Sequence, residues 1–326
     1  MRGAGPRDST AGAPEASWEI TSGTIPLGRP LVMGILNVTP DSFSDGGELT
    51  SIDRLLRRTA TMVGEGAAIL DVGGESTRPG AEAVSEEEEL RRVVPTVERL
   101  RNEFEVPISV DTRKARVAKE ALDAGASIVN DVSGLGFDPG MPRVVAEAAA
   151  GVVIMHMRGT PADMREYVVY DDLVAEVRSE LLDGVERALG AGVHPDAIVV
   201  DPGIGFAKTP AQSFQLIQEL GRLVDLGYPV LVGPSRKSFL GELLGVAPAD
   251  RAGAGAVVCA LAYERGARLF RVHDVRETVE ALAVAEAVAA ASGSPGPSGG
   301  SASKGGPGRA VFPIVGHGGH YVGEVG

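Results

Sequence analysis

Eight short apolar runs rich in Val and Ile recur along the chain, and helical or polar intervals separate them. Apolar strands that alternate with amphipathic segments are typical of parallel strands covered by helices. Eight such units predict an α/β fold of the (β/α)8 TIM-barrel type, which commonly takes about 250 residues. An open doubly wound sheet is the rival, but no G-x-G-x-x-G turn follows the first run. The runs are residues 31–37, 67–74, 107–112, 127–134, 151–157, 197–205, 229–237 and 268–275.

The segments around these runs predict the domain organisation. We expect residues 1–16 to be disordered and residues 17–290 to form the barrel domain, which opens with a short hairpin at about 17–30. Residues 291–326 are rich in Gly, Pro and Ser, a composition typical of a flexible tail.

Two polar clusters in these segments are candidate metal sites, and both have a simpler interpretation. Ser85 and Glu88 in "SEEEEL" predict a capping box, so the acidic run is interpreted as a helix start. His317 and His320 in the tail could bind a metal, but two histidines among glycines are more typical of an unstructured end.

Composition and charge exclude several classes of protein. The formal net charge is −13 and the pI about 4.9, which argues against nucleic acid or an anionic membrane surface as a partner. Cys259 is the single cysteine, so an internal disulfide is excluded, and no apolar run reaches the roughly 18 residues of a membrane-spanning helix. The sequence therefore predicts a cytoplasmic protein.

Polar residues stand at the end of nearly every predicted strand. One such residue could merely cap the next helix or form an Asx-turn. So many of them on one rim favour a functional site, because barrels carry their active sites at the carboxyl ends of the strands. They are Asn37, Asp71, Asp111, Asn130, Asp131, His156, Asp201, Lys237, Arg271 and His273.

The motifs that contain these residues resemble those of dihydropteroate synthases, in the same order. They are "MGILNVTPDSFSDGG", "DVGGESTRPGA", "SVDT", "NDVSG", "MHMRGTP", "DPGIGFAKT", "SRKSFLG" and "RVHDV". The resemblance extends from about Trp18 to Val288, and Pro234, the loose "GAGAVVCAL" and the tail depart from the pattern. It implies a transferase of folate biosynthesis that joins 6-hydroxymethyl-7,8-dihydropterin pyrophosphate to p-aminobenzoate, uses Mg²⁺, is inhibited by sulfonamides and forms a homodimer.

The resemblance also implies a role for each site residue. Thr77, Asp111, Asn130, Met155, Asp201, Phe206, Gly233 and Lys237 would bind the pterin. Asn37, Arg78, Arg271 and His273 would bind the pyrophosphate, and Phe43, Pro79, Lys237 and Ser238 the p-aminobenzoate. Asn37 and Asp45 would hold the metal, while Lys237, Arg78, Arg271 and His273 would be catalytic. His156 and Arg236 stay outside this set.

Three other functions remain open from the sequence. A methyltetrahydrofolate-dependent methyltransferase would share Asp111, Asn130 and Asp201, but it has no use for cations that grip a diphosphate. A non-catalytic pterin-binding paralogue could lose the first two loops, yet both are complete here. Other phosphate-binding barrels place phosphate after strands seven and eight, which leaves "TPDSFSDGG" without a role.

Overall fold

The computed structural model describes residues 16–38, 47–78 and 80–291, and for 47–51 only the backbone. Apart from Ala16, which accepts a hydrogen bond from Leu27 N, and Ala291, which ends helix α10 (Val275–Ala291), the predicted N-terminal disorder, the flexible tail and the two tail histidines lie outside the described residues.

The eight predicted strands form one parallel sheet that closes into a barrel. The order of the strands is β8-β7-β6-β5-β4-β3-β10-β9. The two end strands meet through a parallel bridge between Val200 and Val230 and a 2.9 Å bond from Val200 N to Pro229 O. The TIM-barrel prediction is therefore confirmed. The strands are β3 (Leu31–Asn37), β4 (Ile69–Gly73), β5 (Ile108–Asp111), β6 (Ile128–Asp131), β7 (Gly151–Met155), β8 (Ile198–Asp201), β9 (Leu231–Val232) and β10 (Leu269–Val272).

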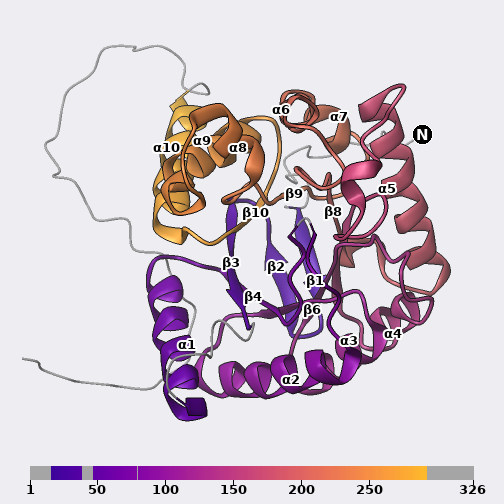
Figure 1. The fold of residues 1–326 in the computed structure, drawn as a ribbon, viewed down its shortest axis with the longest axis vertical. Coiled ribbons are helices and arrows are strands. Elements are labelled where there is room, and N and C mark those ends of the chain that lie inside the picture. Colours follow the sequence, from indigo (N-terminus) through magenta and orange to yellow (C-terminus); the bar gives the residue numbers. More distant parts are fainter. Residues whose placement is uncertain (1–15, 39–46, 79, 292–326) are drawn as a thin grey trace, which may run out of the picture.

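Helices surround the strands as an outer layer (Figure 1). The predicted start of α2 is confirmed, because the Ser85 hydroxyl accepts from Glu88 N. The predicted capping box is only half formed, because the Glu88 carboxylate pairs with Arg91 and Arg92. The helices are α1 (Gly47–Gly64), α2 (Glu86–Glu103), α3 (Ala115–Asp123), α4 (Met141–Glu147), α5 (Leu173–Gly190), α6 (Pro210–Gln218), α7 (Gly221–Val224), α8 (Ser238–Leu244), α9 (Ala252–Glu264) and α10 (Val275–Ala291), with short 3₁₀ turns at Met164–Glu166, Pro195–Ala197 and Pro248–Arg251.

A hairpin of β1 (Ser17–Ile20) and β2 (Gly23–Pro26) closes the amino-terminal end of the barrel, as the sequence predicts. Trp18 is fully buried, and its indole Nε1 donates to Ala197 O at 2.8 Å. Its cluster includes Ile20, Leu27 and the lowest inward-facing side chains of the strands. Since a buried indole N–H needs an acceptor, this bond fixes how the hairpin sits under the barrel.

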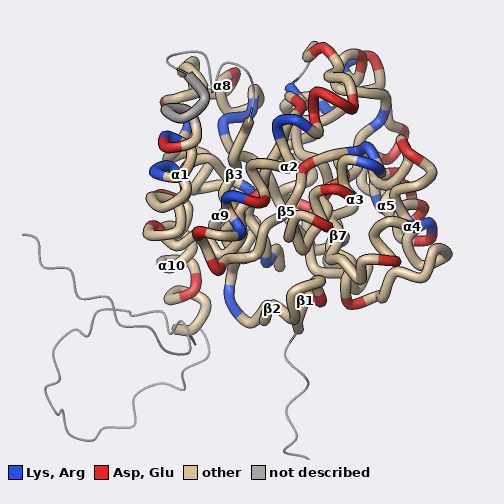
Figure 2. Tube along the Cα trace, turned by 90° about the horizontal axis from the view of Figure 1, so that it is seen from below, with Lys and Arg blue, Asp and Glu red and all other residues tan. Residues whose placement is uncertain are grey.

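The described surface is mixed in charge. Figure 2 shows Lys and Arg interspersed with Asp and Glu over the helices rather than collected on one face. Cys259 is buried in α9, as a packed thiol should be. None of the described helices is by itself long and apolar enough to cross a membrane, although the bent pair Ser238–Leu244 with Pro248–Glu264 passes by length and composition.

Candidate functional site

The site follows from the two-residue period of the strands. Side chains two positions apart on a strand point to the same face. One layer of inward-facing residues, Ile69, Ile128, Val153, Val199, Leu231 and Leu269, packs on the hairpin. Two residues further along the same strands come Asp71, Asn130, Met155, Asp201, Gly233 and Arg271. On four of these six strands the apolar core therefore gives way to a polar side chain two residues further along.

Arg271 lies at the centre of this upper layer, between two buried carboxylates. Its Nε donates to Asp71 Oδ2 at 2.6 Å and its Nη2 to Asp111 Oδ2 at 2.5 Å. Asn130 Nδ2 lies 3.3 Å from the same Asp71 oxygen. Strands β4, β5, β6 and β10 thus meet in one hydrogen-bonded cluster.

Burial changes the acidity of the carboxyl groups in this pocket. It raises the pKa of Asp111 to about 7, with the Arg271 guanidinium opposing that effect and the Asp71 carboxylate adding to it. Burial likewise raises the pKa of Asp201, and Lys237 opposes it. Both are carboxyl groups that a bound hydrogen-bond donor would hold in the ionised form.

Lys237 reaches over the pocket from the loop before α8. Its Nζ lies 3.7 Å above the centre of the Phe206 ring and donates to Ile204 O. A side chain at Gly205 would place its Cβ 2.8 Å from Lys237 Cδ, and the φ of Gly205 is +78°, so glycine suits this position. Burial lowers the pKa of Lys237 to about 7, while Asp201 works in the opposite direction.

Phe206 and Met155 form an apolar wall beside these charges. Both belong to a small buried cluster with Val132, Met164 and Ala207, separate from the main core. Gly233 leaves room at the end of β9, where an added Cβ would lie 3.7 Å from Arg271 Cβ. A flat ring placed here would have apolar contacts on its faces and polar partners at its edges.

The loop after β4 carries Thr77 and Arg78, and ion pairs anchor its base. The Glu75 carboxylate bonds to Lys114 and, at 2.9 Å, to Arg113 Nη2. Thr77 is half-buried and Arg78 is exposed. The loop is therefore fixed at Glu75 and presents Arg78 to solvent at the mouth of the barrel.

His273 stands at the same mouth as Arg78. Burial lowers the pKa of His273 to about 3, and Arg271, Arg236 and Arg78 add to that effect. Ser235 Oγ accepts from His273 N and lies 3.1 Å from His273 Nδ1. The imidazole is thus neutral at pH 7, and a Ser235 hydroxyl that donates to Nδ1 leaves the proton on Nε2.

The remaining predicted residues are placed as follows. Asn37 ends β3 at the rim, where its Oδ1 would lie 3.8 Å from a Cβ on Gly73, and Ser238 is exposed at the first position of α8. Phe43, Asp45 and Pro79 lie outside the described residues.

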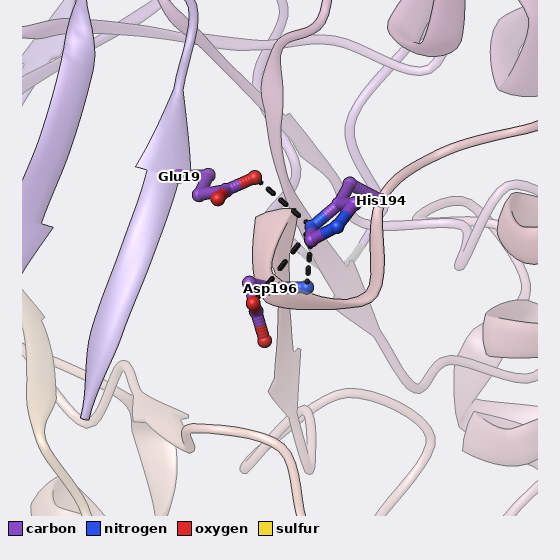
Figure 3. Close-up of side chains that lie close together, drawn as sticks. All are labelled: Glu19, His194 and Asp196. Atoms are coloured by element: carbon purple, nitrogen blue, oxygen red, sulfur yellow. Dashed lines mark hydrogen bonds and ion pairs between the residues drawn. The ribbon is translucent and has the colours of Figure 1, made fainter. Parts of the chain in front are cut away.

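One other group of side chains has the composition of a metal site. Glu19, His194 and Asp196 bring one ligand atom each to within 4.8 Å of one another (Figure 3). All three are exposed at the hairpin end of the barrel, away from the strand ends described above, and Glu19 Oε2 already pairs with His194 Nδ1 at 2.9 Å. We interpret this group as a surface ion pair.

Three residues that the sequence analysis named have contacts that it did not predict. Asp71 stands in its run of apolar residues two positions after Ile69, and this spacing could have shown that it faces inward. Arg271 was predicted to bind pyrophosphate and to be catalytic, which stays a prediction, and in the structure its guanidinium bonds to two carboxylates. Arg236, which was left outside the predicted set, pairs with Asp274.

A barrel with carboxylates and an amide in its floor, an apolar wall and cations at its mouth is a site for a polar heterocycle that carries an anionic group. The family model for pterin binding enzymes matches residues 33–273. The dihydropteroate synthase of Synechocystis is 48% identical over 261 residues, covering 80% of this chain and 90% of the relative.

Solved structures agree with the sequence relatives. The dihydropteroate synthase of Yersinia pestis in a sulfonamide complex has a TM-score of 0.79 and 44% identity, covering 84% of this chain and 99% of that one. The Xanthomonas albilineans enzyme with 4-aminobenzoic acid has a TM-score of 0.79 and 46% identity, covering 85% and 99%. The chain belongs to the pterin-binding enzyme family and, within it, to the dihydropteroate synthases.

The raised pKa of Asp111 predicts a pH-dependent stability. A carboxyl group whose pKa is higher in the folded state stabilises the fold fully below its ordinary pKa, and that contribution is lost as the pH rises through the folded value. Between about pH 4 and pH 7 the ligand-free protein should lose up to about 4 kcal/mol of unfolding free energy through this group. Urea unfolding across this range should show a smaller loss for Asp111→Asn. The exposed Asp123→Asn serves as control, and a pH slope for Asp111→Asn that equals the wild-type slope would contradict the assignment.

Proposed function

We propose that the protein condenses 6-hydroxymethyl-7,8-dihydropterin pyrophosphate with p-aminobenzoate, giving 7,8-dihydropteroate and pyrophosphate. The observation that carries this proposal is the combination of buried carboxylates around Arg271 with Lys237 above them, in a chain that is 46% to 50% identical to several dihydropteroate synthases. The activity is that of a transferase in folate biosynthesis.

The floor of the site suits the pterin. A pterin presents a guanidine-like edge of N–H donors beside ring acceptors, so it needs carboxylates and an amide in fixed orientation. Asp111, Asn130 and Asp201 supply them, and Met155 and Phe206 pack on the ring. Donors on the ligand stabilise the ionised carboxylates, which offsets part of the desolvation that raises their pKa values.

Departure of the pyrophosphate is the step that needs electrostatic help. As the bond between the methylene carbon and its oxygen breaks, positive charge on the methylene spreads into the pterin ring and negative charge grows on the diphosphate. Arg78 and His273 Nε2–H are placed at the mouth to donate to phosphate oxygens. Mg²⁺, for which the oxygen donors Asn37 and Asp45 are suitable ligands, would neutralise further charge on the diphosphate.

p-Aminobenzoate then attacks the methylene carbon through its amine. The amine is a weak nucleophile, so the protein chiefly has to position it. Lys237 and Ser238 lie together at the start of α8, where a carboxylate could bind, and we assign Phe43 and Pro79 to the aromatic ring. The relatives with a bound sulfonamide and bound 4-aminobenzoic acid support this pocket and support sulfonamides as inhibitors.

The methyltransferase alternative fits the site less well. Such an enzyme releases no diphosphate for Arg78, Lys237 and His273 to bind. The relatives from Synechocystis and Escherichia coli are dihydropteroate synthases. A cytoplasmic location stays a prediction, which the single buried thiol supports.

Lys237 provides the direct test of this function. With p-aminobenzoate and Mg²⁺ present, the wild-type protein should convert the pterin diphosphate to 7,8-dihydropteroate and pyrophosphate. Lys237→Ala should lower kcat/KM at least about tenfold, because a lost charge-assisted bond costs about 1.5 to 3 kcal/mol. The exposed Lys119→Ala is the matched control. Near-normal kcat/KM in Lys237→Ala would exclude the proposed role.

Binding should be ordered, because the p-aminobenzoate pocket and the diphosphate contacts share two loops. Phe43 accompanies Asp45 on one loop, and Pro79 adjoins Arg78 on the other. A ligand shifts a loop equilibrium only by its differential affinity for the two states. Calorimetry should therefore show weak binding of p-aminobenzoate or a sulfonamide alone and much tighter binding with pyrophosphate and Mg²⁺. Arg78→Ala should weaken this coupling, whereas equal affinities in the two titrations would show that the pocket is preformed.

We also propose that the protein is a homodimer. Val257 and Leu261 lie four residues apart on α9 and are exposed, and Leu243 of α8 and Val284 of α10 are exposed as well. A second copy with the same patch would cover these side chains. Sedimentation equilibrium should give twice the mass of the chain, and Val257→Glu with Leu261→Glu should shift it towards the monomer. A wild-type monomer at micromolar concentration would refute the proposal.

A further inference from the structure

A polar network that is buried at Lys208 and His156 and half-buried at Glu180 and Arg158 lies behind the pterin wall, and Phe206 is its only member that the proposed mechanism uses directly. Lys208 is 8% exposed, and its Nζ donates to Phe206 O at 2.9 Å and lies 2.9 Å from His156 Nδ1. His156 Nε2 lies 3.0 Å from Glu180 Oε2, and Glu180 also accepts from Arg158. The network therefore runs from the loop after β8 to helix α5.

The protonation pattern of this network follows from its partners. The Arg158 and His156 hydrogen bonds outweigh burial and lower the pKa of Glu180 to about 2, so Glu180 is an ionised acceptor. Burial lowers the pKa of His156 to about 4, and Lys208 adds to the effect, so the ring is neutral at pH 7. A neutral ring that donates from Nε2 to Glu180 must accept at Nδ1. Lys208 is the donor to that nitrogen.

The loop that Lys208 holds, residues 202–209, has an unusual backbone. A Cβ on Gly203 would lie 1.9 Å from His156 O, and the φ of Gly203 is +65°. Ala207 has a φ of +47°, and its carbonyl accepts from the Tyr170 hydroxyl at 2.9 Å. A non-glycine residue at positive φ persists only where its surroundings hold it, so this loop depends on its contacts for its shape.

These contacts hold the loop from two sides. On the outer side Lys208 binds the Phe206 carbonyl, and on the pocket side Lys237 binds the Ile204 carbonyl and lies over the Phe206 ring. Burial lowers the pKa of Lys208 well below its ordinary value, and Lys237 adds to the effect, so a charged amine is costly at this position. An apolar side chain would avoid that cost, but it could not bond to the Phe206 carbonyl and the His156 ring together.

We propose that Lys208, held by the neutral His156 ring, is a positioning residue that fixes Phe206 as the stacking wall of the pterin pocket. Lys208 touches neither substrate. Its effect is on the affinity for the pterin ring and not on the contacts to the diphosphate. The inference rests on the proposed function, because it assigns Phe206 to the pterin.

The test separates the pterin ring from the diphosphate. Titrations would measure the Kd of 6-hydroxymethylpterin and, separately, of inorganic pyrophosphate. Lys208→Met should raise the pterin Kd at least about tenfold and leave the pyrophosphate Kd within about twofold. In turnover the KM for the pterin diphosphate should rise more than kcat falls, since the lost contact acts on the ground state and the transition state alike. Glu176→Gln, which alters a partner of Arg158 at the outer end of the network, should keep the wild-type pterin Kd.

A pair of substitutions at His156 tests the same point independently and applies even if Lys208→Met fails to fold. In His156→Asn the amide oxygen can take the place of Nδ1 and still accept from Lys208. In His156→Gln the amide can take the place of Nε2 and keep the bond to Glu180 only. We expect a pterin Kd near wild type for Asn and a several-fold higher Kd for Gln.

Three results would overturn the proposal. They are a wild-type pterin Kd in folded Lys208→Met, a parallel rise in the Kd of pterin and pyrophosphate, and equal pterin Kd values in the two His156 variants. Failure of the proposed function itself would look different, because the wild-type protein would then neither bind the pterin nor release pyrophosphate.

Discussion

Arg271 of β10 binds two carboxylates from β4 and β5, which lie far from it in the chain, and the site is organised around these contacts. Asp71 and Asp111 lie 200 and 160 residues from Arg271 in sequence, and both are buried. Two carboxylates this close in a poorly solvated pocket need a cation between them, and removal of one partner from such a cluster typically costs about 3 to 5 kcal/mol. Loss of one member of the cluster would therefore destabilise the barrel, and the intact cluster keeps two carboxylates in place as acceptors for the pterin.

The fold could be predicted because the sequence pattern that indicates each strand lies within a few neighbouring residues. Each strand is an apolar run that ends in a polar residue, and each of the eight runs contains one strand. The alternation around Trp18 likewise predicted the hairpin. The bounds were less exact, since β9 has only two residues in a run of nine. That run continues into the loop of Pro234 and Arg236, and Arg236 adopts a φ of +57° that a strand does not use.

The site was less predictable where contacts join distant segments. Motif resemblance indicated Asp111, Asn130 and Asp201. The structure places Asn130 and Asp201 in one layer with Asp71, which was noted at a strand end and left without a role, and Asp111 bonds to the same Arg271 as Asp71. The partner of Lys208 could not be inferred, because His156 and Glu180 come from a strand end and a helix that only the closed barrel brings together. Sequence patterns report which face a residue occupies, whereas pairing between faces depends on the completed fold.

The hairpin beneath the barrel determines at which end of the barrel ligands enter and leave the pocket. Trp18 and its neighbours fill the amino-terminal end, so in the described part of the chain the pocket above them opens toward the carboxyl ends of the strands. The pterin lies deepest in the proposed arrangement, and the diphosphate and p-aminobenzoate lie between it and solvent. Pyrophosphate must then leave before dihydropteroate can leave. Slow release of pyrophosphate would make product release, rather than bond formation, the rate-limiting step.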